Sequence, residues 1–382
     1  MEWVKGEIIG KGSFSSVYLA TPRSNFYESP PLMAVKSSLV SQSSLLQKEK
    51  EILTQLRDCP QILNCFGDDL TVEKNGEKFY NLFLEFASGG NLAQLLKKSG
   101  GSISESHVRC YTKSILQGIL NIHEKGYVHC DIKLQNILLC CSSDGSTEVK
   151  IADFGLAKKS GQMKNNSGEI DEEIFSLRGT PLYMAPESVS SKEFESPSDI
   201  WALGCVMSEM ISGKPAWRCR ADSDVSALLY RIGFRDEVPE IPDELCEEGK
   251  DFLRKCFVRD PTKRWTAEML LNHPFIVDSP VSLPLNEKAS PRSAFDFPEW
   301  SSQESSIFNS IESSSPSILH FDEEFNGSEC SGSSSPSPSD RIRQLAWGNE
   351  LNLSFTDSWI TVRTESSVSG IEELKLQSSK SQ

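Results

Sequence analysis

Four side chains that could do chemistry lie within eight positions of one another: a ring at His129, a carboxylate at Asp131, an ammonium at Lys133 and an amide at Asn136. A second carboxylate, Asp153, follows seventeen positions after Asn136. A carboxylate that can act as a base, a cation and two oxygen ligands for a divalent metal ion suit phosphoryl transfer.

The segment between Asn136 and Asp153 has the pattern of a β-hairpin. Apolar runs at 137–141 and 148–152 flank a polar turn that contains Asp144-Gly145, a typical hairpin signal. Such a hairpin would bring Asn136 and Asp153 together at the open ends of its strands.

Two glycines near the start of the chain, Gly10 and Gly12, lie between two apolar runs within residues 3–20. This pattern predicts a strand–turn–strand, in which glycines let backbone N–H groups approach a phosphate closely. A plain hairpin explains the pattern about equally well. A dinucleotide-binding Rossmann turn is disfavoured, because it requires a strand followed by a helix.

A short strand ends in Lys36, and a helical pattern follows from about 42 to 56. Glu49 lies on the apolar face of this helix. A lone lysine is usually a solvated surface group, but a carboxylate on an apolar face needs a cation, so we expect Lys36 to pair with Glu49. Glu51 is the less favoured alternative, because it lies off the apolar face.

Two further helices are predicted to position these groups. One has Ser104 as its N-cap and Gly126 as its left-handed stop. The other opens with Ser196 at the N-cap and Pro197 at the first helical position, and it is apolar on nearly all sides, which predicts burial. Asp199 lies near its positive end and is expected to be ionised and to accept backbone N–H bonds.

The composition limits the classes of function. A net charge of −15 over 382 residues disfavours nucleic-acid and anionic-membrane partners. The 11 cysteines include no Cys-x-x-Cys pair, which argues against a disulfide framework and a structural zinc. Neither a signal peptide nor a transmembrane run is recognisable. We therefore expect an intracellular protein without a membrane partner, in the cytoplasm, with the nucleus left open.

The composition changes near residue 277. Residues 278–382 hold 28 serines, and 16 acidic against 7 basic residues. Such a segment cannot bury enough surface to fold alone, so 277–382 is predicted to be a mostly disordered, acidic tail. Apolar islands at Trp347 and Trp359 would either bind regulators or be inert. The Ser-Pro pairs starting at 290, 315, 335 and 337 would either be sites for proline-directed kinases or arise by chance.

The stretch from His129 to Asn136, with the later Asp153-Phe-Gly, resembles the catalytic loop and metal-binding motif of eukaryotic protein kinases. The other elements that match this family, in order, are the glycine loop, Lys36, Glu49, a hinge at 81–92, Ala185-Pro-Glu187, Asp199 and Arg264. The resemblance covers about residues 3–276. It implies an α+β, two-lobed protein-kinase fold, with a small β-rich N-lobe at about 3–86 and a large, mostly helical C-lobe at about 87–276.

The resemblance implies ATP as a cofactor. Lys36, held by Glu49, would orient the α and β phosphates. Leu84 would be the gatekeeper of the adenine site, and Glu85 and Ala87 would hydrogen-bond adenine through their backbone. The residues implied in the glycine-rich loop are Ile9, Gly10, Lys11, Gly12, Ser13, Phe14, Ser15, Ser16 and Val17.

The same resemblance implies Mg²⁺ and a division of chemical roles. Asn136 and Asp153 would be the metal ligands. Asp131 would orient the substrate hydroxyl and accept its proton, and Lys133 would contact the γ-phosphate. The Asp-x-Lys pattern, with Thr180 further along, resembles Ser/Thr kinases rather than tyrosine kinases.

The polar span from 156 to about 178 resembles the kinase activation segment. Its candidate phosphorylation positions are Ser176 and Thr180. The segment ends at Glu187, and the resemblance implies Arg264 as the buried partner of that carboxylate.

Two positions depart from the family pattern. Ser15 replaces the third glycine of the loop, which is expected to stiffen the loop slightly and is compatible with catalysis. Cys130 replaces an arginine that in many kinases binds a phosphorylated activation-segment residue through paired hydrogen bonds, which a thiol cannot offer. Either the segment orders itself, or Lys158 and Lys159 substitute for the arginine.

Within the kinases, three motifs are similar to MEKK-type MAP kinase kinase kinases, above all to the short plant members: Trp-x-x-Gly at the start, His-Cys-Asp-Ile-Lys, and Gly-Thr-Pro-x-x-Met-Ala-Pro-Glu. This implies phosphorylation of the activation loop of MAP kinase kinases in stress or hormone signalling. The alternatives are a pseudokinase scaffold, which would be free to lose Lys36, Asp131, Asn136 and Asp153, and a signalling adaptor that acts through the tail.

Overall fold

The computed structural model describes residues 2–12, 15–23, 32–141, 146–161, 178–218 and 224–277. Three predicted site residues, Ser13, Phe14 and Ser176, lie outside these ranges. The predicted tail from residue 278 onward and most of the predicted activation segment also lie outside the described residues.

The N-terminal part of the chain forms a five-stranded antiparallel sheet with the strand order β1-β2-β3-β5-β4. Its strands are β1 (Trp3–Lys11), β2 (Ser16–Pro22), β3 (Met33–Leu39), β4 (Cys65–Val72) and β5 (Lys78–Glu85). One helix, α1 (Ser44–Leu56), lies beside this sheet and buries the apolar face that the sequence predicts. It starts slightly later than predicted, because Val40–Gln42 forms a 3-10 turn.

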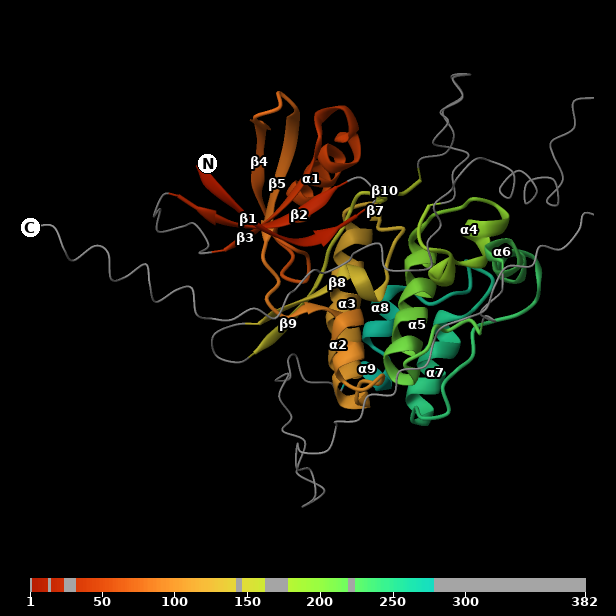
Figure 1. Ribbon diagram of the computed structural model, residues 1–382. Helices are drawn as coiled ribbons and strands as arrows, with labels where there is room; N and C mark the ends of the chain where they lie inside the picture. Colours follow the sequence, from red (N-terminus) through yellow and green to blue (C-terminus); the bar gives the residue numbers. More distant parts are fainter. Residues whose placement is uncertain are drawn as a thin grey trace, which may run out of the picture.

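The rest of the described chain is mainly helical and lies at the opposite end of the molecule in Figure 1, which confirms the two-lobed α+β prediction. Its helices are α2 (Leu92–Lys98), α3 (Glu105–Glu124), α4 (Pro186–Ser190), α5 (Ser196–Ser212), α6 (Val225–Phe234), α7 (Glu247–Cys256), α8 (Ala267–Leu271) and α9 (Pro274–Val277). Short strands and 3-10 turns connect them: β6 (Gly90–Asn91), β7 (Tyr127–Val128), η2 (Leu134–Asn136), β8 (Ile137–Cys141), β9 (Thr147–Ile151), β10 (Lys158–Lys159) and η4 (Pro181–Tyr183).

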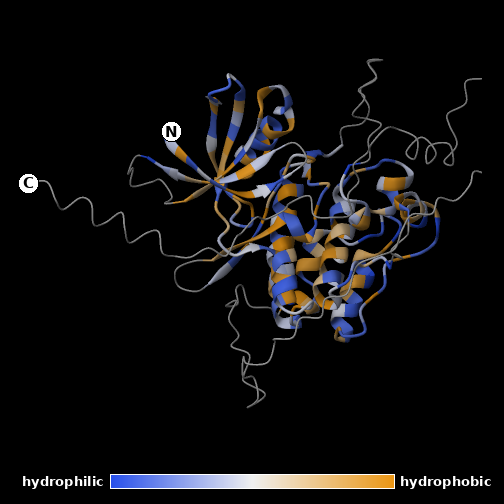
Figure 2. Cartoon of the chain, in the orientation of Figure 1, coloured by the Kyte–Doolittle hydropathy of each residue, from blue (hydrophilic) through white to orange (hydrophobic). Residues whose placement is uncertain are grey.

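Helices α3 and α5 form the centre of the helical region, and hydrophobic residues gather along both of them (Figure 2). Trp201 of α5 is fully buried; its ring stacks on Trp217 and meets Phe257 edge to face at 5.3 Å. The apolar residues of α3 that recur at helical spacing are also buried: Val108, Tyr111, Ile115, Ile119 and Ile122. This packing holds the loop after α3 against a rigid core.

One of the two predicted N-caps is displaced by one residue, and the other is at the predicted position but lacks its side-chain bond to the helix. Helix α5 begins at Ser196, so Glu195, with its extended backbone (φ −122°, ψ 173°), occupies the N-cap instead. Ser104 does precede α3, but its hydroxyl bonds to the His107 ring at 2.7 Å and caps no backbone N–H. Gly126 has the predicted left-handed conformation, with φ 74°.

Gly213 ends α5 in the left-handed conformation, with φ 68°, and a Cβ there would overlap the carbonyl oxygen of Gly101. We expect Gly213→Ala to lower the free energy of unfolding by more than about 2 kcal/mol, because backbone overlap adds to the strain of a left-handed alanine. Gly126→Ala is the matched control, since φ is similar and its Cβ would meet open space. Chemical denaturation of both variants tests this, and equal losses would contradict it.

Candidate active site

A cleft of about 850 Å³ is lined by residues of both the sheet and the helical region. Most of the predicted nucleotide and metal residues lie in its walls: Ile9, Gly10, Val17, Lys36, Glu49, Leu84, Glu85, Ala87, Asn136 and Asp153. Of the remaining glycine-loop residues, the structure describes Lys11, Gly12, Ser15 and Ser16, which lie outside this lining. Residues far apart in the sequence therefore meet at one opening.

The glycine loop joins β1 to β2 at the edge of the cleft. Gly10 pairs with Val17 and Lys11 with Ser16, and the Gly12 N–H donates to the Ser15 carbonyl at 2.8 Å. The plain hairpin and the phosphate-binding loop are thus one geometry, and only a bound phosphate would distinguish them.

The Lys36 ammonium donates to two carboxylates, Glu49 at 2.7 Å and Asp153 at 3.0 Å. Although burial works to lower the pKa of Lys36, the charges of Asp153 and Glu49 raise it, so the lysine stays charged. Burial alone would raise the pKa of Asp153, but Lys36 lowers it, so this carboxylate is ionised. The predicted Lys36–Glu49 pair is confirmed, whereas the alternative partner, Glu51, is exposed.

The predicted hairpin between Asn136 and Asp153 is also present. Strand β8 pairs with β9 in antiparallel register, from Ile137 opposite Ile151 to Cys141 opposite Thr147. The Ala152 N–H donates to the Asn136 carbonyl at 2.9 Å, which places Asp153 beside Asn136.

The donor set of this hairpin fits Mg²⁺. Asn136 donates from Nδ2 to the backbone carbonyl and to Oδ2 of Asp131, at 2.9 and 3.0 Å. Its Oδ1 is buried and has no hydrogen-bond partner among the described residues. Burial of an oxygen without a hydrogen-bond donor is energetically costly unless a ligand binds that oxygen. Asn136 lines the same cleft as the ionised Asp153, so a metal ion could bind both. Asn136 and Asp153 would hold the metal ion.

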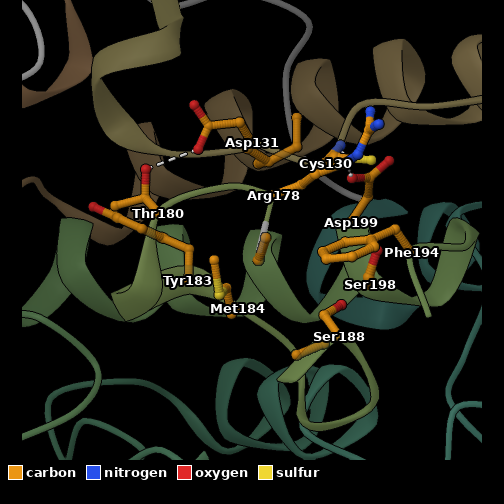
Figure 3. A pocket seen from close by; sticks show the side chains of 13 residues that line it. Cys130, Asp131, Arg178, Thr180, Tyr183, Met184, Ser188, Phe194, Ser198 and Asp199 are labelled. Carbon is orange, nitrogen blue, oxygen red and sulfur yellow. Dashed lines mark hydrogen bonds between the residues drawn. The ribbon is translucent and has the colours of Figure 1, made fainter. Parts of the chain in front are cut away.

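Asp131 and Lys133 bind each other and Thr180. The Lys133 ammonium lies 2.8 Å from Asp131 Oδ2 and donates to Thr180 Oγ1 at 3.0 Å. The Thr180 hydroxyl donates to Asp131 Oδ1 at 2.8 Å, and Figure 3 shows these two side chains facing each other. A carboxylate that binds a hydroxyl, with a cation at its other oxygen, can orient an alcohol and accept its proton.

Comparison with known proteins agrees with this geometry. The family model of the protein kinase domain matches residues 3–276. The chain belongs to the protein kinase family. It is 46% identical to mitogen-activated protein kinase kinase kinase 20 of Arabidopsis thaliana over 376 residues, which cover 95% of this chain and 100% of that protein. It is 42% identical to kinase kinase kinase 17 of the same plant over 80% of this chain and 78% of that protein, and 38% identical to number 18 over 95% and 99%. The chain is thus a protein serine/threonine kinase that resembles the MEKK type.

Asp199 holds the catalytic loop of this kinase by its backbone. The two oxygens of this buried carboxylate accept the backbone N–H groups of His129 and Cys130, at 2.9 and 3.0 Å, and Oδ2 also contacts the His123 ring at 3.0 Å. Burial opposes ionisation, but the His123 hydrogen bond and these donors lower the pKa of Asp199. The prediction that Asp199 is ionised and accepts backbone N–H bonds is confirmed.

His129 joins the catalytic loop to the segment that follows β9 and carries Asp153. Its Nδ1 accepts the Asp131 N–H at 3.2 Å, so the proton lies on Nε2, which donates to the Ala152 carbonyl at 3.1 Å. Its ring meets Phe154 edge to face at 4.8 Å.

Cys130 has φ 67°, and its backbone N–H is bound by Asp199. Burial and, to a lesser extent, the Asp199 charge raise the pKa of its thiol well above the usual range, so the thiol is neither a nucleophile nor an anion. Lys158, one of the two lysines that could replace the missing arginine, lies 2.7 Å from Glu195. The charge of Lys158 is therefore already balanced by the Glu195 carboxylate.

Sequence reasoning missed several polar contacts of the site. The Tyr183 hydroxyl donates to Glu209 at 2.6 Å, and the Glu85 carboxylate binds Lys150 and Asn64. No local periodicity indicates such pairs, because the partners lie on different elements.

Among the residues that the structure describes, no helix combines the length and apolar character needed to cross a bilayer.

The segment that ends at Glu187 is fixed by the expected partner. Arg264 donates to both Glu187 oxygens, at 2.6 and 2.9 Å, and to the carbonyls of Val258, Pro197 and Arg259. Both side chains of the pair are nearly inaccessible, with 0% and 9% exposure. Such a bidentate pair leaves a buried charge if one partner is removed.

We expect Arg264→Met to lower the free energy of unfolding by about 3–5 kcal/mol, because Glu187 would remain buried without its cation. Arg254→Met is the control: its pair with Glu247 is exposed and 4.0 Å long, so the loss should stay within about 0.5 kcal/mol. Urea denaturation of both variants measures the difference. A small loss for Arg264→Met would show that the pair does not hold this segment.

Proposed function

We propose that this kinase is a MAP kinase kinase kinase, which transfers the γ-phosphoryl group of ATP to a serine or threonine in the activation loop of MAP kinase kinases. The observation that carries the proposal is the bonded cluster of Asp131, Lys133 and Thr180, next to the cleft that contains the Lys36–Glu49 pair. The names of the Arabidopsis relatives that match nearly the whole chain support the substrate class.

In this proposal ATP lies in the cleft, with adenine against the backbone of Glu85 and Ala87 and with Leu84 as the gatekeeper behind it. Lys36 orients the α and β phosphates. Because two carboxylates already hold its ammonium, little side-chain freedom is lost when the nucleotide binds. Magnesium, held by Asn136 and Asp153, supplies positive charge to the phosphate oxygens.

Asp131 then acts on the substrate alcohol. Its Oδ1 already accepts a hydrogen bond from the Thr180 hydroxyl, which supports its use for a serine or threonine of the substrate. It orients that hydroxyl and accepts its proton as the bond to phosphorus forms. Lys133 stabilises the charge that develops on the transferred group.

Two competing functions have less support. A scaffold without catalysis has no need for Lys36, Glu49, Asp131 and Asp153 in bonded positions, and all four have them. An adaptor that acts through the tail depends on residues outside the described ranges, so tail-binding regulators and proline-directed kinases stay hypotheses. The role in stress or hormone signalling rests on the resemblance to plant relatives.

The activation segment of the proposed kinase has two candidate positions. The Thr180 hydroxyl is bonded to Asp131 and Lys133, which favours a role in substrate recognition. Ser176 lies outside the described residues and stays the predicted regulatory position.

We expect Asp131→Asn to lower the rate of phosphate transfer about 10²- to 10⁴-fold, because an amide cannot accept the substrate proton. Incorporation of labelled phosphate from Mg-ATP into purified MAP kinase kinases, each tested separately, measures this and identifies the substrate. Asp58→Asn, at an exposed carboxylate, is the control. Equal incorporation by Asp131→Asn and the unaltered protein would refute the mechanism.

The proposed catalytic domain is residues 3–276, so a chain that stops after Val277 should keep its rate of phosphate transfer. Helix α9, the last helix of the described residues, ends there, and Phe275 and Ile276 are buried within the domain. Transfer rate and thermal unfolding of the truncated chain provide the measurement. Loss of folding would show that the tail packs on the domain.

A further inference from the structure

The carboxylate of Glu85, at the end of β5, is the centre of a bonded cluster behind the cleft. Both of its oxygens lie 2.9 Å from the Lys150 ammonium. Its Oε2 also accepts from Asn64, at 3.2 Å from the backbone nitrogen and 2.9 Å from the side-chain amide. The Glu85 N–H in turn donates to the Asn64 carbonyl at 2.9 Å. We call Asn64, Glu85 and Lys150 the hinge network.

The three members of the hinge network come from three different segments. Asn64 lies in the loop between α1 and β4, Glu85 at the point where the sheet meets the hinge, and Lys150 on β9. Lys150 is paired in register with Leu138, which lines the nucleotide cleft, and it precedes Asp153 by three residues. The network therefore joins the backbone that faces adenine to β9, the strand that leads to the metal ligand Asp153.

The ammonium of Lys150 depends on Glu85 for its charge balance. Lys150 is 5% exposed, and its other carboxylate contact, Glu148, is more distant at 3.6 Å and largely exposed. Burial works to lower the pKa of Lys150, but the Glu85 contact raises it, so the lysine is charged. A buried cation requires such a partner, which fixes the position of Glu85 relative to β9.

We propose that the hinge network positions the adenine-binding backbone of residues 85–87 relative to Asp153, and so sets the affinity for ATP. Lys150 and Asn64 are positioning residues, since neither ammonium nor amide needs to touch the nucleotide. This inference rests on the proposed role of the cleft as the ATP site. When the network is broken, the hinge and β9 shift relative to each other. The adenine-binding backbone and Asp153 are then no longer aligned with the adenine and the phosphates of the same ATP molecule.

The proposal predicts that loss of the network weakens ATP binding without affecting the residues that act on the protein substrate. Asp131, Lys133 and Thr180 bond to one another, and the segments that carry them contain no member of the hinge network. Loss of the network should therefore raise the KM for ATP while the KM for the protein substrate and kcat at saturating ATP stay the same. A general loss of folding would not produce this division.

The test uses the full-length protein, with the Kd of Mg-ATP measured by competition against a fluorescent ADP analogue, and with steady-state kinetics on a purified MAP kinase kinase. Lys150→Met and Glu85→Gln should each raise the Kd and KM for ATP about three- to tenfold, with kcat within about twofold. The double variant should be about as weak as the weaker single variant, because both remove one interaction. Lys150→Arg should restore binding, and Glu148→Gln, which alters the exposed contact, is the control.

Three outcomes would overturn the inference: unchanged ATP affinity in both single variants, additive losses in the double variant, or a change in kcat with ATP affinity unaltered. Glu85→Gln conserves the side-chain volume, so it decides the matter even if Lys150→Met fails to fold. If the unaltered protein does not bind Mg-ATP, the proposed function itself fails, and this result is distinct from the others.

Discussion

The Lys36 ammonium, bonded to Glu49 and Asp153, is the contact on which the catalytic arrangement depends. It joins a strand of the sheet, the helix beside the sheet and the loop after β9, at 2.7 and 3.0 Å. The Glu49 carboxylate also accepts the Phe154 N–H at 3.2 Å, so α1 is held to the segment around Asp153 directly by this bond and indirectly through Lys36. Because the cation and the Glu49 side chain are nearly excluded from water, removing one of them would leave a charge without a partner. The two lobes are thereby held in one relative position.

A second set of contacts holds the catalytic loop to the helical core. Asp199 is directed at the backbone and binds two consecutive N–H groups, those of His129 and of Cys130, and Cys130 has a positive φ of 67°. Asp153 has a positive φ as well, 66°. Non-glycine residues in this conformation are strained, and here bonds to buried side chains compensate for the strain at both positions. Two loops that carry reacting groups are therefore rigid for the same physical reason.

Much of this could be predicted from sequence, and the limits have physical causes. The hairpin between Asn136 and Asp153 has a local turn signal, and the Glu49 position follows from helical periodicity, so both were confirmed. The Glu187–Arg264 pair has no local signal and was reached only through the family resemblance. The predicted N-cap of α5, Ser196, was wrong by one residue. A serine before a proline can be either the N-cap or the first helical residue, and the local sequence does not distinguish the two. The hinge network escaped prediction because its members meet only after the lobes have packed.

Cys130 stands where many kinases have an arginine, and the described loop at Gly179 and Thr180 contacts the catalytic loop through other groups. Gly179 has φ 99°, and a Cβ there would lie 2.5 Å from the Cys130 carbonyl oxygen, so only glycine allows this close approach. The next residue, Thr180, is bonded to both Asp131 and Lys133. Gly179 and Thr180 are thus joined directly to the catalytic loop through the protein's own groups. The Cys130 thiol donates to the Val128 carbonyl at 3.6 Å, while its backbone N–H binds Asp199, so both groups of this residue hold the catalytic loop in place.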